Sequence, residues 1–146
     1  MGLDIDDDMR EFIRHHRVAR LATADTNGQP AVVPICYAFD GGAIYSAIDE
    51  KPKRVAPHSL KRVRNIAANP KVSMVIDDYS EDWSELAFIM ISGNAEIIEP
   101  DQNVEEHIQA IELLREKYPQ YRSMAIDKRA LIKITPTRIR RWAAKG

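Results

Sequence analysis

The fold is decided by residues 17–48, which read RVARLATADTNGQPAVVPICYAFDGGAIYSAI. Side chains in residues 17–25 alternate between two faces, which is the two-residue period of a strand. Asn27-Gly28 follows, and this dipeptide is the strongest short hairpin signal. A second strand is therefore expected over residues 31–39.

This second strand contains Pro34, which cannot donate a hydrogen bond to a neighbouring strand. We therefore expect a bulge or a sheet edge at Pro34. Asp40-Gly41-Gly42 is another tight turn, and residues 43–48 form a third strand. Two successive hairpins predict an antiparallel meander and not a βαβ unit.

Three helices are expected outside this meander. The acidic run at residues 4–8 suits the start of a short first helix. Leu60, Val63 and Ala67 predict a helix from about residue 58 that ends at Asn69-Pro70. A third helix over residues 101–117 presents Val104, Ile108, Ile111 and Leu114 on one face, with Asp101 as its candidate cap.

Four further strands complete the expected set, at residues 72–76, 86–98, 130–135 and 138–142, with Gly93 a candidate bulge. Short antiparallel strands need closure to hide their edges. The sequence thus predicts a mainly β protein, a six- or seven-stranded antiparallel barrel with a few helices, in a single domain over residues 1–146.

Composition excludes several classes of protein. Of the 146 residues, 45% are hydrophobic, which indicates a globular chain. A net charge of −1 argues against a nucleic-acid partner, and no apolar run is long enough for a membrane helix. The single cysteine, Cys36, and the lack of a signal-peptide pattern lead us to expect a cytoplasmic protein.

Residues 51–64 are basic, with six Lys or Arg residues and no acid. Fixed cations and a following helix N-terminus are what a phosphorylated cofactor requires. The alternative is that these side chains are solvated charges beside a helix. The residues alone favour the solvated charges, and only a family resemblance, carried by the three stretches quoted next, leads us to expect a cofactor phosphate against Lys51, Lys53 and Arg54.

Three stretches in order carry a resemblance to a known family: IYSAID at 44–49 running into KPKR at 51–54, LKRVRNIAANPKVS at 60–73, and RRW at 140–142. The chain resembles the pyridoxamine 5'-phosphate oxidase-like family of FMN-binding split barrels. Within that family it is most similar to the small members that depend on a deazaflavin. The resemblance covers about residues 17–142 and implies a split barrel.

The resemblance also implies site residues. Tyr45 and Ser46 match strand positions that face the ribityl chain and ring, although either is also ordinary strand filling. Val33, Pro34 and Ile35 match the stretch whose backbone meets the polar edge of the isoalloxazine. Trp142 matches aromatic residues that reach toward the cofactor of the partner subunit, with a packing lid as the alternative.

A homodimer is expected, because a barrel this small cannot enclose a three-ring ligand alone. FMN and coenzyme F-420 stand at near-even odds as the cofactor. Helical spacing puts Lys61 and Arg64 on one face with Arg62 turned away, which would suit the anionic tail of F-420.

These features favour an FMN- or F-420-dependent oxidoreductase that transfers hydride to or from a small organic substrate. The arginine and histidine pair that true pyridoxamine phosphate oxidases carry near the C-terminus is missing, which argues against that activity. The alternatives are a flavin-storing or flavin-sensing protein, or a dimer that binds haem or another anion.

No metal site and no catalytic acid or base is predicted. The four histidines, His15, His16, His58 and His107, show no ligand spacing. Cys36 is interpreted as a buried apolar residue and not as a nucleophile. Trp83, in the acidic segment 77–85, is an expected anchor for a ligand or partner.

Overall fold

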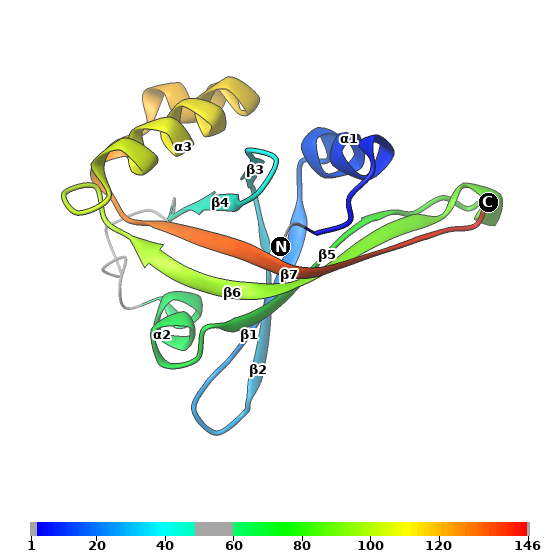
Figure 1. The fold of residues 1–146 in the computed structure, drawn as a ribbon, viewed down its shortest axis with the longest axis horizontal. Helices are drawn as coiled ribbons and strands as arrows, with labels where there is room; N and C mark the ends of the chain where they lie inside the picture. Colours follow the sequence, from blue (N-terminus) through cyan, green and yellow to red (C-terminus); the bar gives the residue numbers. More distant parts are fainter. Residues whose placement is uncertain (1–2, 49–59, 146) are drawn as a thin grey trace.

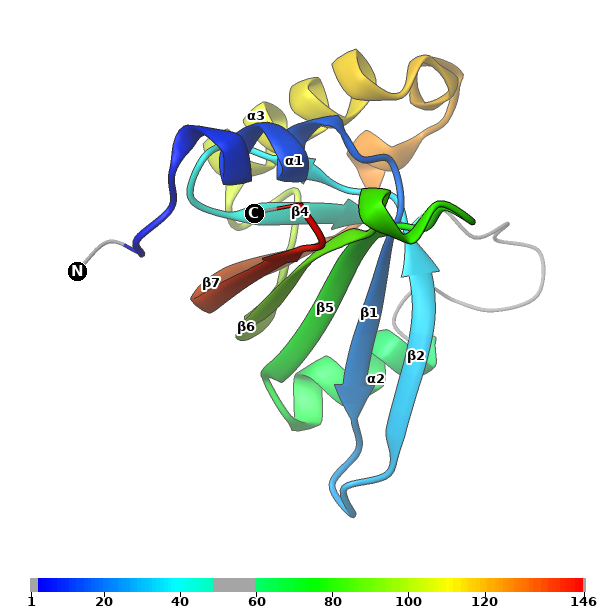
Figure 2. The same cartoon turned by 90° about the vertical axis from the view of Figure 1, so that its right-hand side faces the viewer.

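The computed structural model describes residues 3–48 and 60–145. It contains one seven-stranded sheet, with strand order β2-β1-β5-β6-β7-β4-β3 and every pairing antiparallel. The sheet curls strongly, with three α-helices around it (Figures 1 and 2). The strands are β1 (Ala19–Ala24), β2 (Pro30–Ile35), β3 (Ala38–Phe39), β4 (Ile44–Ala47), β5 (Lys71–Asp78), β6 (Ala87–Ile98) and β7 (Leu131–Ala143).

The curl follows from the chain connectivity. The two edge strands of the sheet, β2 and β3, are separated in sequence by only Cys36 and Tyr37. Two residues cannot span an open seven-stranded sheet, because strands lie about 4.8 Å apart. The sheet must therefore bend round until its edges meet at this corner, which confirms the expected split barrel. We call the junction of β2, β3 and β4 the seam.

Both predicted hairpin turns are present. Gly28 and Gly41 have φ values of 81° and 102°, a region that glycine enters without strain. In the first turn the Asp25 carboxylate accepts hydrogen bonds from the amides of Asn27 and Gln29. In the second, the Asp40 carboxylate accepts from Gly42 and Ala43.

The strand count of seven is confirmed, although two boundaries differ from the prediction. Residues 31–39 form two strands, because the chain turns at Cys36 and Tyr37 and not at Pro34. Pro34 lies within β2, at the sheet edge that the sequence offered as one alternative. Residues 130–142 form one strand, β7, which continues through the irregularity that the sequence had suggested as a break.

That irregularity lies opposite Gly93, the predicted bulge. Ser92 pairs with Arg138 while Gly93 pairs with Pro136, so Thr137 is the extra residue in β7. A Cβ on Gly93 would lie 2.6 Å from the Thr135 carbonyl oxygen, which explains the glycine. Beyond the bulge, β5, β6 and β7 extend away from the barrel as a long ribbon that we call the arm (Figure 1).

The helices are α1 (Asp7–His15), α2 (Lys61–Ala68) and α3 (Val104–Lys117), with 3-10 turns at Trp83–Glu85, Pro119–Ser123 and Ile126–Lys128. The first is capped by Asp6, as the acidic run suggested. Asp101 is not the cap of α3, since the helix begins two residues later than predicted, after Asn103. None of the described helices is long and apolar enough to cross a membrane.

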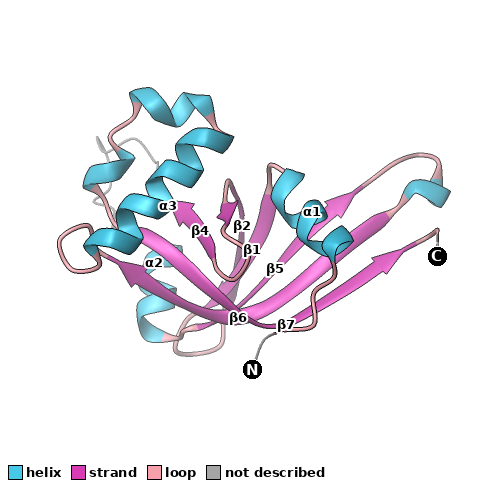
Figure 3. Cartoon of the chain, turned by 45° about the horizontal axis from the view of Figure 1, so that its top comes forward, coloured by secondary structure: helices cyan, strands magenta, loops and turns pink. Residues whose placement is uncertain are grey.

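Two apolar clusters hold the fold together. One fills the barrel interior and includes Leu21, Met74, Ile89 and Ile134. The other lies between α3 and the outer side of β4, and includes Tyr45, Ile111 and Leu114. Figure 3 shows α3 lying over this end of the sheet while the arm projects on the other side.

Candidate functional site

A pocket of about 250 Å³ opens at the seam. We call it the seam pocket. It is lined by Val18, Pro34, Ile35, Cys36, Ser46, Ala47 and Arg62. Three of the predicted cofactor residues, Pro34, Ile35 and Ser46, therefore come together although they lie on two strands that do not pair with each other.

The polar groups of the seam pocket are few and well oriented. The Ser46 hydroxyl donates a hydrogen bond to the Cys36 carbonyl oxygen at 2.9 Å, which ties β4 to the corner of the seam. With its proton used in this way, the Ser46 oxygen can only accept from a ligand. Pro34 lies on an edge strand, where part of the backbone is unpaired.

Among the described residues that line the seam pocket, the cation is Arg62. The sequence had predicted that this side chain points away from the site. The reason is a rotation of α2 about its axis. Val63, Asn65 and Ile66 are its buried residues, whereas Ala67, assigned to the inner face by spacing, is exposed. Arg62 precedes Ile66 by four residues and therefore shares its side of the helix.

A buried polar contact fixes this rotation. The Asn65 amide donates to the Thr23 hydroxyl at 3.0 Å, which joins α2 to β1. Both residues are buried. A pattern of apolar residues alone could not reveal this contact, because Asn is ordinarily a surface residue in a helix. The position of Ile66 was the available signal, since it places Arg62 beside the core face.

Lys61 and Arg64, expected to share a face toward the cofactor, lie apart from the seam pocket. Arg64 lines a different pocket of about 490 Å³, together with Ile97 and Glu99. Lys61 is exposed and close enough to Asp25 to help lower the pKa of that carboxyl. Lys51, Lys53 and Arg54 lie outside the described residues.

Tyr45 and Ser46 are neighbours whose side chains point in opposite directions, as strand geometry requires. The Tyr45 hydroxyl donates to Glu106 of α3 at 2.6 Å, and Lys133 forms an ion pair with the same carboxylate at 2.6 Å. Burial and this hydrogen bond raise the pKa of Tyr45, while the two donors lower the pKa of Glu106. Tyr45 thus joins β4 to α3 and does not line the seam pocket.

Val33 is also absent from the pocket lining. It is partly buried against the barrel core, on the face of β2 opposite Pro34. Trp142 lies on the arm, 46% exposed, with its ring stacked on Phe88 at a centroid distance of 5.7 Å. Neither residue is in contact with the seam pocket within one chain.

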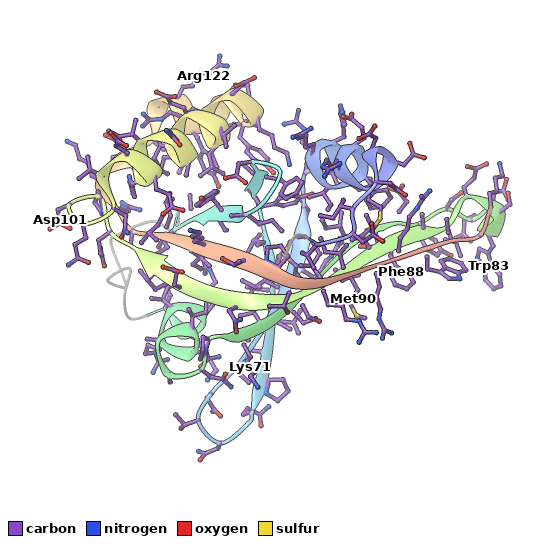
Figure 4. All side chains as sticks on the ribbon, viewed as in Figure 1. Lys71, Trp83, Phe88, Met90, Asp101 and Arg122 are labelled. Carbon is purple, nitrogen blue, oxygen red and sulfur yellow. The ribbon has the colours of Figure 1, made fainter. Side chains whose placement is uncertain are left out.

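The arm carries an apolar surface that the sequence analysis missed. Phe88 and Met90 are exposed on the same side of β6, visible below the arm in Figure 4. By pairing register this side also carries Trp142 of β7, Val75 of β5, and Pro34 and Val32 of β2. Arg140 and the Arg20–Asp77 ion pair lie among these apolar residues. We call this side the bare face. Residues 87–92 carried the sequence signal for this surface. In a strand they would place mostly apolar side chains on both sides of the sheet.

Trp83, the expected anchor, lies at the tip of the arm and is exposed (Figure 4). The described residues contain no group of three potential metal ligands. Cys36, interpreted from the sequence as a buried apolar residue, is only partly buried: it packs against the second apolar cluster and also lines the seam pocket.

Comparisons with known proteins agree with this geometry. The haem storage protein HutZ of Vibrio cholerae has a TM-score of 0.72 at 18% identity, covering 98% of this chain and 95% of its own. An FAD-binding protein of Mesorhizobium loti has a TM-score of 0.69 at 19% identity, covering 94% of each chain. An F-420 reductase has a TM-score of 0.64 at 22% identity, covering 93% and 98% respectively.

These identities establish the fold, and the fold alone does not name a ligand. No functionally curated protein is significantly similar in sequence. The sequence profile described as pyridoxamine 5'-phosphate oxidase matches residues 5–143, which is nearly the whole chain. The chain therefore belongs to the pyridoxamine 5'-phosphate oxidase family of split barrels.

Proposed function

We propose that this protein is an oxidoreductase that holds a flavin-type cofactor in the seam pocket and moves hydride to or from a small organic molecule. The observation that carries the proposal is the convergence of Pro34, Ile35, Ser46 and Arg62 at one opening. Structural similarity to an FAD-binding protein and to an F-420 reductase supports a flavin-type ligand.

The lining suits such a group. Val18, Ile35 and Ala47 offer apolar surface for a ring, and the Arg62 guanidinium is a fork that matches a phosphate. Among the lining residues that the structure describes there is no carboxylate or imidazole. A bound flavin supplies the hydride chemistry itself, and the protein's part is to bind and orient it. No residue of the seam pocket is therefore given the role of a general acid or base.

The pocket also supports a homodimer. Small-molecule sites usually measure about 300–1,000 Å³, and the seam pocket is smaller than that range. Pro34 belongs to both the pocket and the bare face. We propose that a second copy packs on the bare face and supplies the rest of the cofactor site, with Trp142 as a candidate contributor.

FMN and coenzyme F-420 both carry a phosphate that Arg62 would bind. They differ in the anionic tail of F-420, for which Lys61 and Arg64 were the predicted partners. If these cations hold the tail, Lys61→Glu with Arg64→Glu will weaken F-420 binding and flatten its salt dependence. FMN binding by the same variant will change little.

Haem is a second candidate, favoured by the similarity to HutZ over 98% of this chain. Arg62 would then pair with a propionate. The absorption spectrum separates the candidates, because haem gives a Soret band and flavins give their own visible bands. Turnover with a reductant then separates an enzyme from a protein that only stores its ligand.

The decisive experiment is a titration of the protein with FMN, F-420 and haem. Arg62→Ala should weaken binding of the accepted ligand about tenfold or more, since a charge-assisted hydrogen bond contributes roughly 1.5–3 kcal/mol. Arg64→Ala is the matched control for FMN, two residues away on the same helix. If Arg64→Ala weakens FMN binding more than Arg62→Ala does, the cofactor lies outside the seam pocket.

A further inference from the structure

A second pocket, of about 320 Å³, lies between α1, β3 and α3, and its lining residues are Arg14, Ala38, Phe39, Leu113, Glu116 and Lys117. Both helices stand on the same side of the sheet with β3 between them (Figure 1). It is separate from the seam pocket, with which it shares no lining residue. We call it the helix pocket.

Lys117 is the unusual residue of the helix pocket. Its Nζ atom is buried and makes no hydrogen bond within the described chain. It lies 3.9 Å from the ring centroid of Tyr37 and 5.4 Å from that of Tyr118. The aromatic faces offset part of the cost of burying the ammonium, but its three donors remain unsatisfied. Such a group calls for an explanation, and a bound anion is one.

Arg14 is the second cation in the lining of the helix pocket. Its guanidinium carbon lies 6.0 Å from the centroid of the Phe39 ring, and it makes no ion pair or hydrogen bond among the residues the structure describes. Arg17 adds positive charge nearby, because its guanidinium donates to the Lys117 carbonyl. Arg14 and Lys117 are thus the two cations in the lining, and Arg17 lies close to Lys117.

Among the described lining residues, Glu116 is the one acid. It precedes Lys117 on α3, and adjacent residues of a helix point to different sides. Glu116 is exposed at the rim, so it does not neutralise the buried amine. The lining of the helix pocket thus combines two cations, Arg14 and Lys117, with the apolar side chains of Ala38, Phe39 and Leu113.

We infer that the helix pocket binds a small organic anion, a carboxylate with an apolar body, between Arg14 and Lys117. The carboxylate would satisfy the Arg14 fork and the Lys117 ammonium, and the apolar body would lie against Phe39 and Leu113. Lys117 reaches the ligand by turning its flexible four-carbon chain away from the Tyr37 ring. This site is independent of the cofactor proposed above.

The affinity of the helix pocket for an anion should depend on pH, because the Lys117 amine must be protonated to bind it. Burial lowers the pKa of Lys117 to about 8, with Arg17 contributing and the Cys36 thiol opposing. An anion binds the charged amine and raises that pKa, so its affinity should fall as pH rises above about 8. Burial raises the pKa values of Tyr37 and Tyr118, which keeps both neutral over this range.

The test uses benzoate as the probe and isothermal titration of the full chain. We expect saturable binding at pH about 6.5 and an affinity about tenfold or more lower at pH about 9.5. Lys117→Met should weaken binding about tenfold at the lower pH and remove the pH dependence. Arg14→Gln should weaken binding at both pH values. Lys128→Met, on the following 3-10 turn, is the matched lysine control.

Cys36→Ser tests the neighbouring thiol, and the pH dependence should survive it. Lys117→Met keeps the apolar stem, and its unfolding transition checks that it folds. In the wild type the Nζ resonance of Lys117 should titrate near pH 8 and shift to higher pH with benzoate. No binding of benzoate, binding unchanged in Lys117→Met, or a Lys117 titration that ignores benzoate would overturn the inference.

Discussion

The outer side of the sheet is covered at one end and uncovered at the other. Over β4, α3 packs Ile111 and Leu114 against Tyr45, which is only 4% exposed. Over the arm, Phe88, Met90 and Trp142 are also apolar and point outward, yet they remain 36–46% exposed. The same kind of side chain is thus buried within the chain in one region and left open in the other.

This contrast is the basis for proposing the bare face as the surface that a second copy covers. Contiguous exposed apolar surface marks an interaction site more often than single exposed residues do. The seam pocket adjoins the bare face through Pro34. The covered end should therefore respond to mutation through stability, and the bare face through association and ligand binding.

The largest effect is expected at the covered end. Leu114→Ala empties a fully buried site between α3 and the sheet and should lower the free energy of unfolding by about 2–5 kcal/mol. Chemical denaturation measures this directly. Ile108→Ala, on the exposed side of the same helix, should change stability far less. Equal losses in the two variants would mean that α3 does not pack as described.

The next largest loss of stability is expected at Gly93, where the arm leaves the barrel. Gly93→Ala places a Cβ 2.6 Å from the Thr135 carbonyl oxygen, and the strands must separate to admit it. We expect a loss of about 1–3 kcal/mol in the free energy of unfolding. Ser92→Ala, one residue before the bulge, serves as the control. A neutral Gly93→Ala would show that the bulge is not tightly packed.

At the bare face the expected effect is on association. Met90→Asp should raise the dimer dissociation constant about tenfold or more, which is about 1.4 kcal/mol, because a charge would be buried in the interface. Its monomer stability should hardly change, since Met90 is already exposed. Ile108→Asp makes the same change at an exposed apolar residue of α3 and should leave association intact. Sedimentation equilibrium distinguishes the two.

The smallest effect on stability is expected at Glu106, which joins α3 to the sheet through Lys133 and Tyr45. Lys133 and Tyr45 lower the pKa of Glu106, so its carboxylate stabilises the fold above its unfolded pKa of about 4.3. This contribution is lost as the pH falls through the folded pKa. We expect Glu106→Gln to be less stable than the wild type at pH 7 by under about 1 kcal/mol. The difference should shrink below about pH 4, and a gap that persists there would have another cause.

Much of the fold was predictable because its signals are local. The glycines of both hairpin turns, the alternation of the first strand and the bulge at Gly93 each depend on a few adjacent residues. The division of residues 31–39 was not predictable, because the corner at Cys36 and Tyr37 depends on distant contacts. The Tyr118 hydroxyl, for example, lies 3.1 Å from the Tyr37 amide nitrogen and accepts its hydrogen bond.

The candidate site was predictable in part for the same reason. Pro34, Ile35 and Ser46 stand on strands whose register the sequence indicates, and they converge at the seam. Arg62 was missed because the rotation of α2 depends on Asn65 and Thr23, which lie 42 residues apart. The bare face was missed because its exposure depends on what α3 leaves uncovered, which no local pattern reveals.

Sedimentation velocity followed at the visible absorption band of the bound cofactor tests the central claim most directly. We predict that the cofactor absorbance sediments with a dimer in the wild type, and that Met90→Asp neither dimerises nor retains the cofactor. Cofactor that sediments with a wild-type monomer at full occupancy, or that stays bound to monomeric Met90→Asp, would contradict a cofactor site shared between two copies.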